Sequence, residues 1–498
     1  MDRLSILKAL SFGHQVAEDE KSELADYFVS TNDWERMYAG DIDIVYGAKG
    51  SGKSAIYFEL LNKKDDLFSD SRIRLIPAER PSGSPVFVAL KADPPTSETD
   101  FNFLWKLYFL SLIVSDVREE ISGDTRIGSL VATLESAKLL ERDASLASRL
   151  RAVSDYIKRF TKISAVEPSL SVDPNTQALT GVGLKISFHE PGVEDREQGV
   201  RSVDQLFSEL DSALYDHNLR IWIALDRLDV AFAESSDLEE NALRSLFRVY
   251  IDLRAYSAIS LKLFLRTDIW RRITRKGFRE ATHITRIVTL DWNESNLLFL
   301  IVNRLLSNSD IVEEFGVDPE EVRTNREHQE RLFYEVFPDQ MEGGSKKPST
   351  FRWMLRRVED GEGKVTPREL IQLLSAARDA QIHRLEIGTT EKANEKLFSA
   401  AAIRDALPGV SKTRLEQYLY AEYHECREWI ERLRGQGTNL RRSALQKRWK
   451  CDNEELDKRI ARLIEIGFFR YRNGDSDGLY HVPYLFQSAL DMVQRTDE

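Results

Sequence analysis

The sequence predicts an α/β fold built around a parallel β-sheet. Three short apolar runs, residues 42–46, 221–225 and 261–265, have the length of buried strands. Stretches with helical spacing of apolar residues separate them, and a glycine-rich loop follows the first run directly. Strands that alternate with helices are typical of parallel sheets, because each parallel connection needs a long crossover.

The first half of the chain predicts the start of this sheet. An N-terminal helical segment over residues 1–40 precedes the strand at 42–46, and a helix at 55–61 follows the glycine loop. A second buried strand is expected at 86–90, bounded by prolines. Two helices and a β-hairpin then form an insertion at about 100–200; they lie at 101–117, 134–160 and 170–187.

The second half of the sheet region continues with six elements. In chain order they are a helix, a strand, a helix, a strand, a basic helix and a strand, at 202–215, 221–225, 238–250, 261–265, 268–276 and 284–290. The sheet domain is therefore expected to span 41–290.

Beyond residue 290 the patterning is mainly helical. We expect a helical lid, a helical connector and a winged-helix-like domain, at 291–385, 386–435 and 436–498. One long helix is predicted at 415–433. Helices at 441–449 and 453–466, followed by strand, turn and strand, indicate the winged helix.

Composition limits the classes of function. The 498 residues, 42% hydrophobic and 31% charged, suit several globular domains. A net charge of −12 requires any DNA contact to be local. The two cysteines, Cys426 and Cys451, form no CxxC pair, so a reducing cytosol is the expected compartment. No apolar run approaches the roughly 18 residues of a membrane helix, so no membrane contact is expected.

The strongest motif is the glycine loop. It reads Gly47, Ala48, Lys49, Gly50, Ser51, Gly52, Lys53 and Ser54, and satisfies GxxxxGK[ST] between a strand and a helix. Glycines let backbone N–H groups turn inward at a helix N-terminus, where the helix dipole favours phosphate. Lys53 is expected to neutralise the β- and γ-phosphates of ATP, and Ser54 to bind Mg²⁺. The alternative is a glycine turn that binds nothing.

This motif refines the expected fold. The sequence predicts a P-loop NTPase sheet with a helical insertion, a helical lid and a C-terminal winged-helix domain. The carboxylate that completes the Mg²⁺ shell is expected at the end of a buried strand beside the loop strand, and Asp226 fits. Asp229 is a candidate for orienting the attacking water; capping a helix is its alternative role.

Two arginines are candidates for sensing the γ-phosphate. Arg266, Thr267 and Asp268 emerge at the end of the strand at 261–265, where an arginine or threonine could register the γ-phosphate. We favour this role over a simple helix cap by Asp268, although both could hold together. Arg368 lies in the first turn of a helix that Thr366 is expected to cap. The alternative for Arg368 is a surface ion pair.

Six segments together resemble a known group. FGHQVAEDE, DYFVSTNDW, YGAKGSGKSAIY, IALDRLDVAF, LFLRTDIW and VTPRELIQLL are similar, in that order, to bacterial P-loop ATPases of the AAA+/STAND type, with origin-recognition-like and KAP ATPases as relatives. The resemblance covers about residues 12–380. It implies Mg-ATP binding by Lys53, Ser54 and Asp226, with Arg266 and Arg368 as sensors.

The resemblance also implies a biological setting. Such ATPases are molecular switches or oligomerising enzymes, so a homo-oligomer with a separate effector partner is expected, often in antiphage defence. Arg227 stands where AAA+ ATPases commonly carry a glutamate, so slow hydrolysis is expected. The basic helix carries Arg271, Arg272, Arg275 and Arg279, at a place where neighbouring subunits of AAA+ assemblies receive an arginine finger. Arg275 and Arg279 are the two to test as fingers; a solvated basic face is the alternative.

The C-terminal domain indicates a second function. Residues 440–472 hold ten Lys/Arg and five Asp/Glu, a local balance of +5. Arg459, Arg462, Arg470 and Arg472 are therefore candidates for contacts with double-stranded DNA. The alternative is a protein-docking module, because the acidic residues at 452–457 would repel DNA.

Two hypotheses follow. The first is an Mg-ATP-hydrolysing switch that couples nucleotide state to self-assembly or partner engagement. The second is a nucleotide-gated DNA-binding regulator with little hydrolysis. Serine, cysteine or zinc hydrolases are not expected, because the eight histidines are scattered and no HExxH motif occurs.

Overall fold

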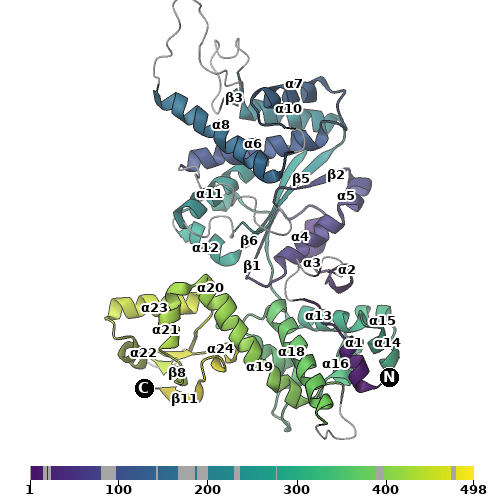
Figure 1. Ribbon diagram of the computed structural model, residues 1–498, viewed down its shortest axis with the longest axis vertical. Helices are drawn as coiled ribbons and strands as arrows, with labels where there is room; N and C mark the ends of the chain where they lie inside the picture. The colour runs from purple at the N-terminus through teal and green to yellow at the C-terminus, as the bar shows by residue number, and fades with distance from the viewer. Residues whose placement is uncertain are drawn as a thin grey trace, which may run out of the picture. The chain divides into compact units, whose positions relative to one another are not determined.

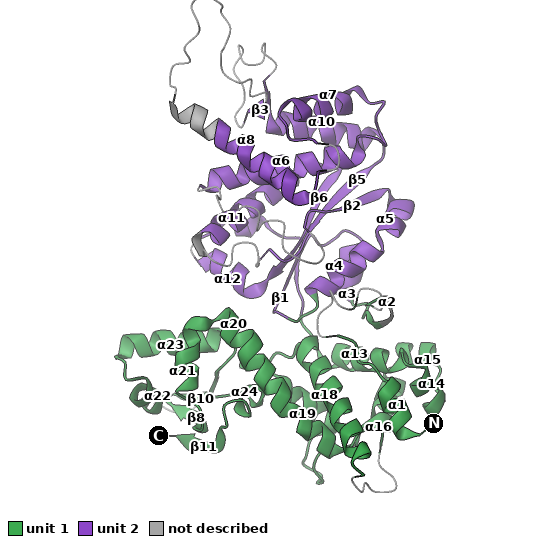
Figure 2. Cartoon of the chain, viewed as in Figure 1, with its two compact units in different colours: residues 1–31, 50–52, 291–498 green, residues 32–49, 53–290 purple. Residues whose placement is uncertain are grey.

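The computed structural model describes most of the chain as two compact units (Figure 2). The described residues are 2–14, 20, 24–79, 97–141, 144–166, 186–187, 200–228, 236–275, 277–388, 396–472 and 478–497. Unit 1 comprises residues 1–31, 50–52 and 291–498, and unit 2 comprises residues 32–49 and 53–290. The finer domain limits stay predictions.

Unit 2 is built around a five-stranded parallel sheet (Figure 1). Its strands are β1 (Ile44–Gly47), β2 (Ile73–Pro77), β5 (Arg220–Leu225), β6 (Ile259–Arg266) and β7 (Ile287–Thr289), in the order β2-β5-β6-β1-β7. All four pairings in it are parallel. The central strands are buried and apolar, as expected for strands covered on both faces. The predicted α/β fold is confirmed.

Helices supply the crossovers of the sheet. α4 (Lys53–Asn62) begins directly after the glycine loop, and α6 (Glu98–Val117) is apolar on nearly every side and therefore buried. Trp105 of α6 donates its indole N–H to Ala242 O at 2.8 Å, which ties α6 to α11 (Ser236–Leu253). The other elements of unit 2 are α3 (Asn32–Tyr38), α5 (Lys64–Ser71), α7 (Thr125–Ser136), α8 (Leu146–Val166), β3 (Ile186–Ser187), β4 (Arg201–Ser202), α10 (Val203–Asp216), α12 (Thr267–Arg275) and η3 (Arg279–His283).

The structure changes the expected position of the second strand. The sheet contains β2 at Ile73–Pro77, which the sequence did not predict, whereas the predicted strand at 86–90 lies outside the described residues. Arg74, which pairs with Glu120, interrupts the apolar residues of β2. The segment therefore lacks the continuous apolar pattern by which the other buried strands were predicted. Of the predicted hairpin at 170–187, only β3 is described, and it pairs in parallel with β4.

A second correction concerns the strand that carries Asp226. We expected β5 to lie beside β1, but β6 lies between them. The order has a physical consequence, because the carboxyl ends of β1, β6 and β5 then form one continuous edge. The residues that follow these three strands emerge together there.

Unit 1 contains the N-terminal and lid helices. They are α1 (Arg3–Ala9), α2 (Leu24–Tyr27), α13 (Glu294–Leu306), α14 (Ser309–Phe315), α15 (Pro319–Thr324), α16 (Arg326–Val336), α17 (Thr350–Val358) and α18 (Pro367–Glu386). Arg304 of α13 is buried, and its Nη1 lies 2.7 Å from Oε1 of buried Glu20. This ion pair connects the N-terminal segment to the lid helices. Separating the two residues would leave an unpaired buried charge, which costs free energy.

The connector differs from the predicted single helix at 415–433, which is wrong. The chain instead forms α19 (Ala400–Thr413), a π-helical turn η4 (Arg414–Leu419), α20 (Tyr420–Glu422), a 3₁₀ turn η5 (His424–Cys426) and α21 (Arg427–Glu431). The helix breaks at Tyr423, whose φ of −131° and ψ of 57° are not helical. Buried Arg414 pairs with Glu369 of α18 at 2.7 Å, which anchors the π-helical turn.

The C-terminal part of unit 1 has the winged-helix elements. β8 (Gly437–Arg441), α22 (Arg442–Trp449), α23 (Asn453–Glu465), β9 (Arg470–Arg472) and β10 (Leu479–His481) follow one another, and β9 pairs with β10 in antiparallel fashion. α24 (Tyr484–Gln487) and β11 (Val493–Asp497) complete this part. β11, which the sequence did not predict, pairs in parallel with β8, and the sheet order is β11-β8-β10-β9.

Candidate nucleotide-binding site

The glycine loop has the backbone that a phosphate cradle needs. Gly50 (φ 84°) and Gly52 (φ 94°) lie in the left-handed region, which strains any residue with a Cβ. α4 begins at Lys53, so the N–H groups of its first turn have no intrahelical partner and point back toward the loop. Together with the positive end of the helix dipole, they favour an anion.

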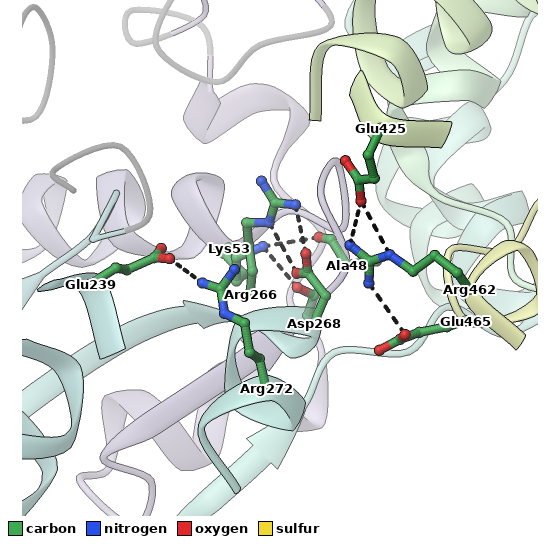
Figure 3. A network of polar contacts seen from close by, with 10 residues as sticks. Ala48, Lys53, Glu239, Arg266, Asp268, Arg272, Glu425, Arg462 and Glu465 are labelled. Carbon is green, nitrogen blue, oxygen red and sulfur yellow. Dashed lines mark hydrogen bonds and ion pairs between the residues drawn. The ribbon is translucent and has the colours of Figure 1, made fainter. Parts of the chain in front are cut away.

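Lys53 is already positioned at this loop. Its Nζ donates to Gly47 O at 3.0 Å and to Ala48 O at 2.9 Å (Figure 3). Both partners are neutral carbonyls, whereas a phosphate oxygen would form a stronger, charge-assisted bond. The ammonium group can therefore exchange these bonds for phosphate contacts.

Ser54 and Asp226 meet although they lie 172 positions apart in the sequence. Ser54 Oγ donates to Asp226 Oδ2 at 2.7 Å, and Asp226 is only 4% exposed. A hydroxyl and a carboxylate together are the hard oxygen donors that Mg²⁺ prefers, so these residues fit that ion. Arg227 follows with φ 59°, a left-handed conformation that turns the chain sharply after Asp226.

Arg266 stands between the glycine loop and the strand of Asp226. It is paired in register with Gly47 on the neighbouring strand. Its guanidinium makes a two-pronged ion pair with Asp268, Nε to Oδ1 at 3.0 Å and Nη2 to Oδ2 at 2.7 Å (Figure 3). Asp268 thus binds Arg266, and a γ-phosphate would compete with this carboxylate for the same guanidinium.

Sequence reasoning missed Glu79, a buried carboxylate at the same edge of the sheet. Pro77 is paired with Ala224, and Ala78 N–H donates to Ala224 O at 2.9 Å, so Glu79 emerges beside Asp226. Glu79 is 1% exposed. An apolar run that ends in an acid was the available signal, but Arg74 and the nearby prolines hid the strand.

Tyr57 of α4 lies near both acids. Its hydroxyl donates to Glu79 O at 3.3 Å. Burial raises the pKa of Tyr57 far above its usual value, and the negative charges of Asp226 and Glu79 raise this pKa further. Both carboxylates therefore lie close to the first turns of the helix that follows the glycine loop.

Residues 50–52, at the tip of the loop, belong to unit 1, where lid residues surround them. Trp292 Nε1 donates to Ser51 O at 2.8 Å. A Cβ added at Gly50 would lie 2.9 Å from Arg368 Cβ and 3.0 Å from Thr366 Oγ1. Arg368 is thus placed at the loop tip, and its contact with a phosphate stays a prediction.

The start of α18 differs from the expected cap. Thr366 is the N-cap residue, but its side chain makes no capping hydrogen bond. Its hydroxyl donates instead to the buried carboxylate of Glu369. Pro367 occupies the first turn as predicted.

The described geometry does not test the roles of three other residues that were predicted to act in catalysis. Asp229 lies outside the described residues. Arg275 and Arg279 are exposed, at the end of α12 and the start of η3. Their role as arginine fingers needs a neighbouring subunit and stays a prediction.

Three of the four arginines predicted to reach DNA form ion pairs within unit 1. Arg459 pairs with Glu455 at 2.7 Å, and Arg470 pairs with Glu359 at 3.0 Å. Arg462 lies between two acids, Glu425 at 3.0 Å and Glu465 at 3.2 Å (Figure 3). Arg472 is exposed on β9.

The solvent-facing side of α23 is consequently not basic. Its exposed residues are Asn453, Glu454, Asp457, Lys458 and Ala461. Two acids and one lysine give this face a formal charge of −1. A negative face opposes the approach of a DNA backbone.

The chain was compared with known proteins. No protein-family model and no curated protein matches it. Two structures of the ORC2 protein of Aeropyrum pernix are similar: the ADPNP-ADP complexes at TM-score 0.36 and 12% identity, covering 94% of this chain and 91% of that chain, and the ADP form at TM-score 0.30 and 13% identity, covering 95% and 90%. Because both TM-scores are below 0.5, the function is inferred from the chain's own residues.

Two features are absent from the described residues. No helix there is both long enough and apolar enough to cross a bilayer. No group of three or more histidine, cysteine or acidic side chains in that part of the chain could hold a metal ion.

Proposed function

We propose that the chain binds Mg-ATP at the glycine loop, hydrolyses it, and acts as a nucleotide-dependent switch. The observation that carries this proposal is the bond between Ser54 and Asp226 at the foot of a glycine loop whose backbone requires glycine. The loop N–H groups and Lys53 fit the phosphates of the ligand. The side-chain oxygens of Ser54 and Asp226 fit its metal ion.

The chain's own residues would act in the reaction as follows. Lys53 and Arg266 leave their present partners and stabilise negative charge on the phosphates. Glu79 or Asp229 orients a water molecule and accepts its proton as the water oxygen bonds to the γ-phosphorus. The bond from that phosphorus to the β–γ bridging oxygen breaks, so ADP leaves with the electron pair. Mg²⁺, when bound, shields the charge on the phosphate oxygens.

The switch would depend on the competition for Arg266 and on the loop tip. Asp268 pairs with Arg266, and a γ-phosphate would compete with Asp268 for this guanidinium. The loop tip touches the start of α18, so nucleotide at residues 50–52 can act on Arg368. Self-assembly, an effector partner, AAA+/STAND membership and a role in antiphage defence remain parts of the proposal that come from the resemblance alone.

The test is ATP binding and hydrolysis by the wild type, Lys53→Ala and Asp226→Asn. We expect the wild type to bind ATP and release phosphate, and both variants to lose turnover by at least about 10²-fold. Tight binding without turnover in the wild type would reduce the protein to a nucleotide-gated scaffold. Absence of ATP binding in a folded wild type would overturn the proposal.

The DNA-regulator hypothesis is not advanced as a second function. It depended on Arg459, Arg462, Arg470 and Arg472. Acids within unit 1 balance the first three, which leaves Arg472, exposed on β9. DNA binding through α23 therefore stays a prediction without supporting contacts.

A further inference from the structure

A basic hollow of about 400 Å³ lies among the lid helices of unit 1. It is lined by residues of α13, α16, α17 and the loop before α17. Five of the lining residues are basic: Arg326, Lys346, Lys347, Arg352 and Arg356. Two are acidic, Glu294 and Glu330, so the lining carries a formal charge of +3 in a chain of net −12. We call this hollow the lid pocket.

Two of these cations are available to a ligand. Lys346 and Arg356 are exposed, and neither makes an ion pair or hydrogen bond with another residue in the part of the chain that the structure describes. A third cation, Lys347, is paired with Glu342 at 2.6 Å, so Lys346 and Arg356 are the unbalanced charges of the lining. Like charges raise one another's energy, and an incoming anion relieves this. The arginines of α23 differ, because acids already neutralise them.

Two more cations can be recruited at small cost. Arg326 pairs with Glu330 at 3.0 Å and Arg352 with Glu294 at 3.4 Å, and all four side chains are about half exposed. Exposed ion pairs contribute little stability, so an anion of higher charge can replace the carboxylates.

The rest of the lining suits phosphate rather than a bare carboxylate. Ser349 precedes the nine-residue helix α17, and its side chain makes no capping bond there. Ser345 adds a second hydroxyl, and the half-buried ring of Tyr334 offers a flat surface. Guanidinium groups bind phosphate oxygens in pairs, hydroxyls donate to the remaining oxygens, and an aromatic ring can stack on a base.

We infer that the lid pocket is a second anion site, which binds the phosphate groups of a nucleotide or of a nucleic-acid strand. The volume lies in the range of small-molecule sites, which admits a whole nucleotide, and the open basic rim also admits a phosphodiester backbone. The site is separate from the glycine loop in sequence and in its residues. It does not depend on the proposed ATPase activity.

The test uses full-length protein with Lys53→Ala, so that binding at the glycine loop is suppressed. The probes are pyrophosphate, ADP, a fluorescent 20-nucleotide single strand and its duplex, measured by calorimetry and fluorescence anisotropy. We expect at least one probe to bind and Lys346→Glu with Arg356→Glu to weaken it by about tenfold or more. For the duplex, the slope of log affinity against log salt should fall by about 0.9 for each phosphate that the variant no longer neutralises.

Matched variants protect the result from misfolding and from general charge effects. Arg331→Glu changes an exposed arginine of α16 that does not line the pocket, and should leave binding unchanged. Arg356→Gln removes one charge and should give a smaller loss than the double reversal. Thermal unfolding of each variant shows that the fold is kept.

The outcomes separate the two sources of phosphate. Binding of pyrophosphate and ADP supports a small-molecule site, and binding of the strand alone supports a nucleic-acid site. The inference is overturned if no phosphate probe binds, or if the double reversal binds as well as Arg331→Glu. Selective binding of an acidic peptide in place of the phosphate probes would also overturn it.

Discussion

The glycine loop and helix α23 were both assigned from local sequence, yet only the loop has the geometry that its assignment needs. In the loop, the decisive features are backbone conformations at Gly50 and Gly52 and the start of α4, all within a few residues. In the winged-helix region, the decisive feature is charge. Glu455 balances Arg459 within α23, but two other acids come from distant parts of the chain. Glu425 and Glu359 lie 37 and 111 positions from their partners, Arg462 and Arg470.

The difference teaches which kinds of sequence signal are reliable. A left-handed glycine and a helix start are properties of the local chain, so tertiary structure seldom changes them. Net charge over a window ignores partners outside the window, and a paired arginine is a poor DNA ligand. The net charge of +5 over residues 440–472 is correct, but it does not describe the charge that α23 presents to solvent.

The largest expected effect tests Glu79 as the proposed general base, a role for which Asp229 is the other candidate. Glu79→Gln should lower kcat for ATP by roughly 10²–10⁴-fold, as expected for loss of a general base, and leave ATP affinity nearly unchanged. The substitution keeps the backbone oxygen that Tyr57 binds. Glu59→Gln, which changes another buried acid on α4, is the matched control. If Glu79→Gln turns over normally and Asp229→Asn does not, Asp229 is the base.

The next effect concerns the winged-helix region and its response to pH. Burial, with the charges of Arg472 and Arg470, lowers the pKa of His481 from 6.5 to about 4. Between pH 4 and pH 6.5 the unfolded chain therefore binds more protons than the folded chain. The contribution of His481 to the free energy of unfolding is complete above pH 6.5 and is lost as the pH falls toward 4.

The difference between the two pKa values changes the free energy of unfolding by at most about 3 kcal/mol between pH 6.5 and pH 4. His481→Gln, which can still bond Asn439, should flatten this part of the pH dependence. The measurement is the free energy of unfolding at pH 7 and pH 4.5 for both proteins. Equal pH dependence in the two proteins would show that His481 is solvated and protonated in the fold.

A smaller effect tests the loop backbone. Gly50→Ala should weaken nucleotide binding by about tenfold, because a Cβ at φ 84° is strained by about 1–2 kcal/mol and would meet Arg368. Gly388→Ala introduces the same strain at φ 70° with no atom within 4 Å of the added Cβ. Gly50→Ala should lose more stability than Gly388→Ala, because its Cβ also meets Arg368, and only Gly50→Ala should lose affinity for nucleotide. Equal affinity in the two would mean that the loop tip does not touch nucleotide.

Much of the fold and about half of the site could be predicted from the sequence. The apolar strands β1, β5 and β6, the glycine loop and Asp226 follow from burial and backbone chemistry. The order of the strands could not be predicted, since it depends on pairing between distant segments. Glu79 was missed because Arg74 interrupts the apolar run of β2, and it lies beside Asp226 only because β2 pairs with β5.

The smallest effect tests the ion pairs that distinguish α23 from the loop. In a double-mutant cycle of Arg462→Ala and Glu425→Ala, we expect a coupling of about 0.5 kcal/mol, because both side chains are more than a third exposed and solvent screens them. Lys458→Ala, which removes an outward-facing pair on the same helix, should change stability by less than about 0.5 kcal/mol.

The same variants also bear on DNA, which makes the comparison decisive. If Arg462 serves the fold, Arg462→Ala changes unfolding and leaves affinity for a 20-base-pair duplex equal to that of Lys458→Ala. A zero coupling together with a tenfold loss of duplex affinity in Arg462→Ala alone would restore α23 as a DNA-contacting helix. It would also show that the ion pair between Arg462 and Glu425 opens readily. The net charge of residues 440–472 would then predict DNA binding better than the ion pairs do.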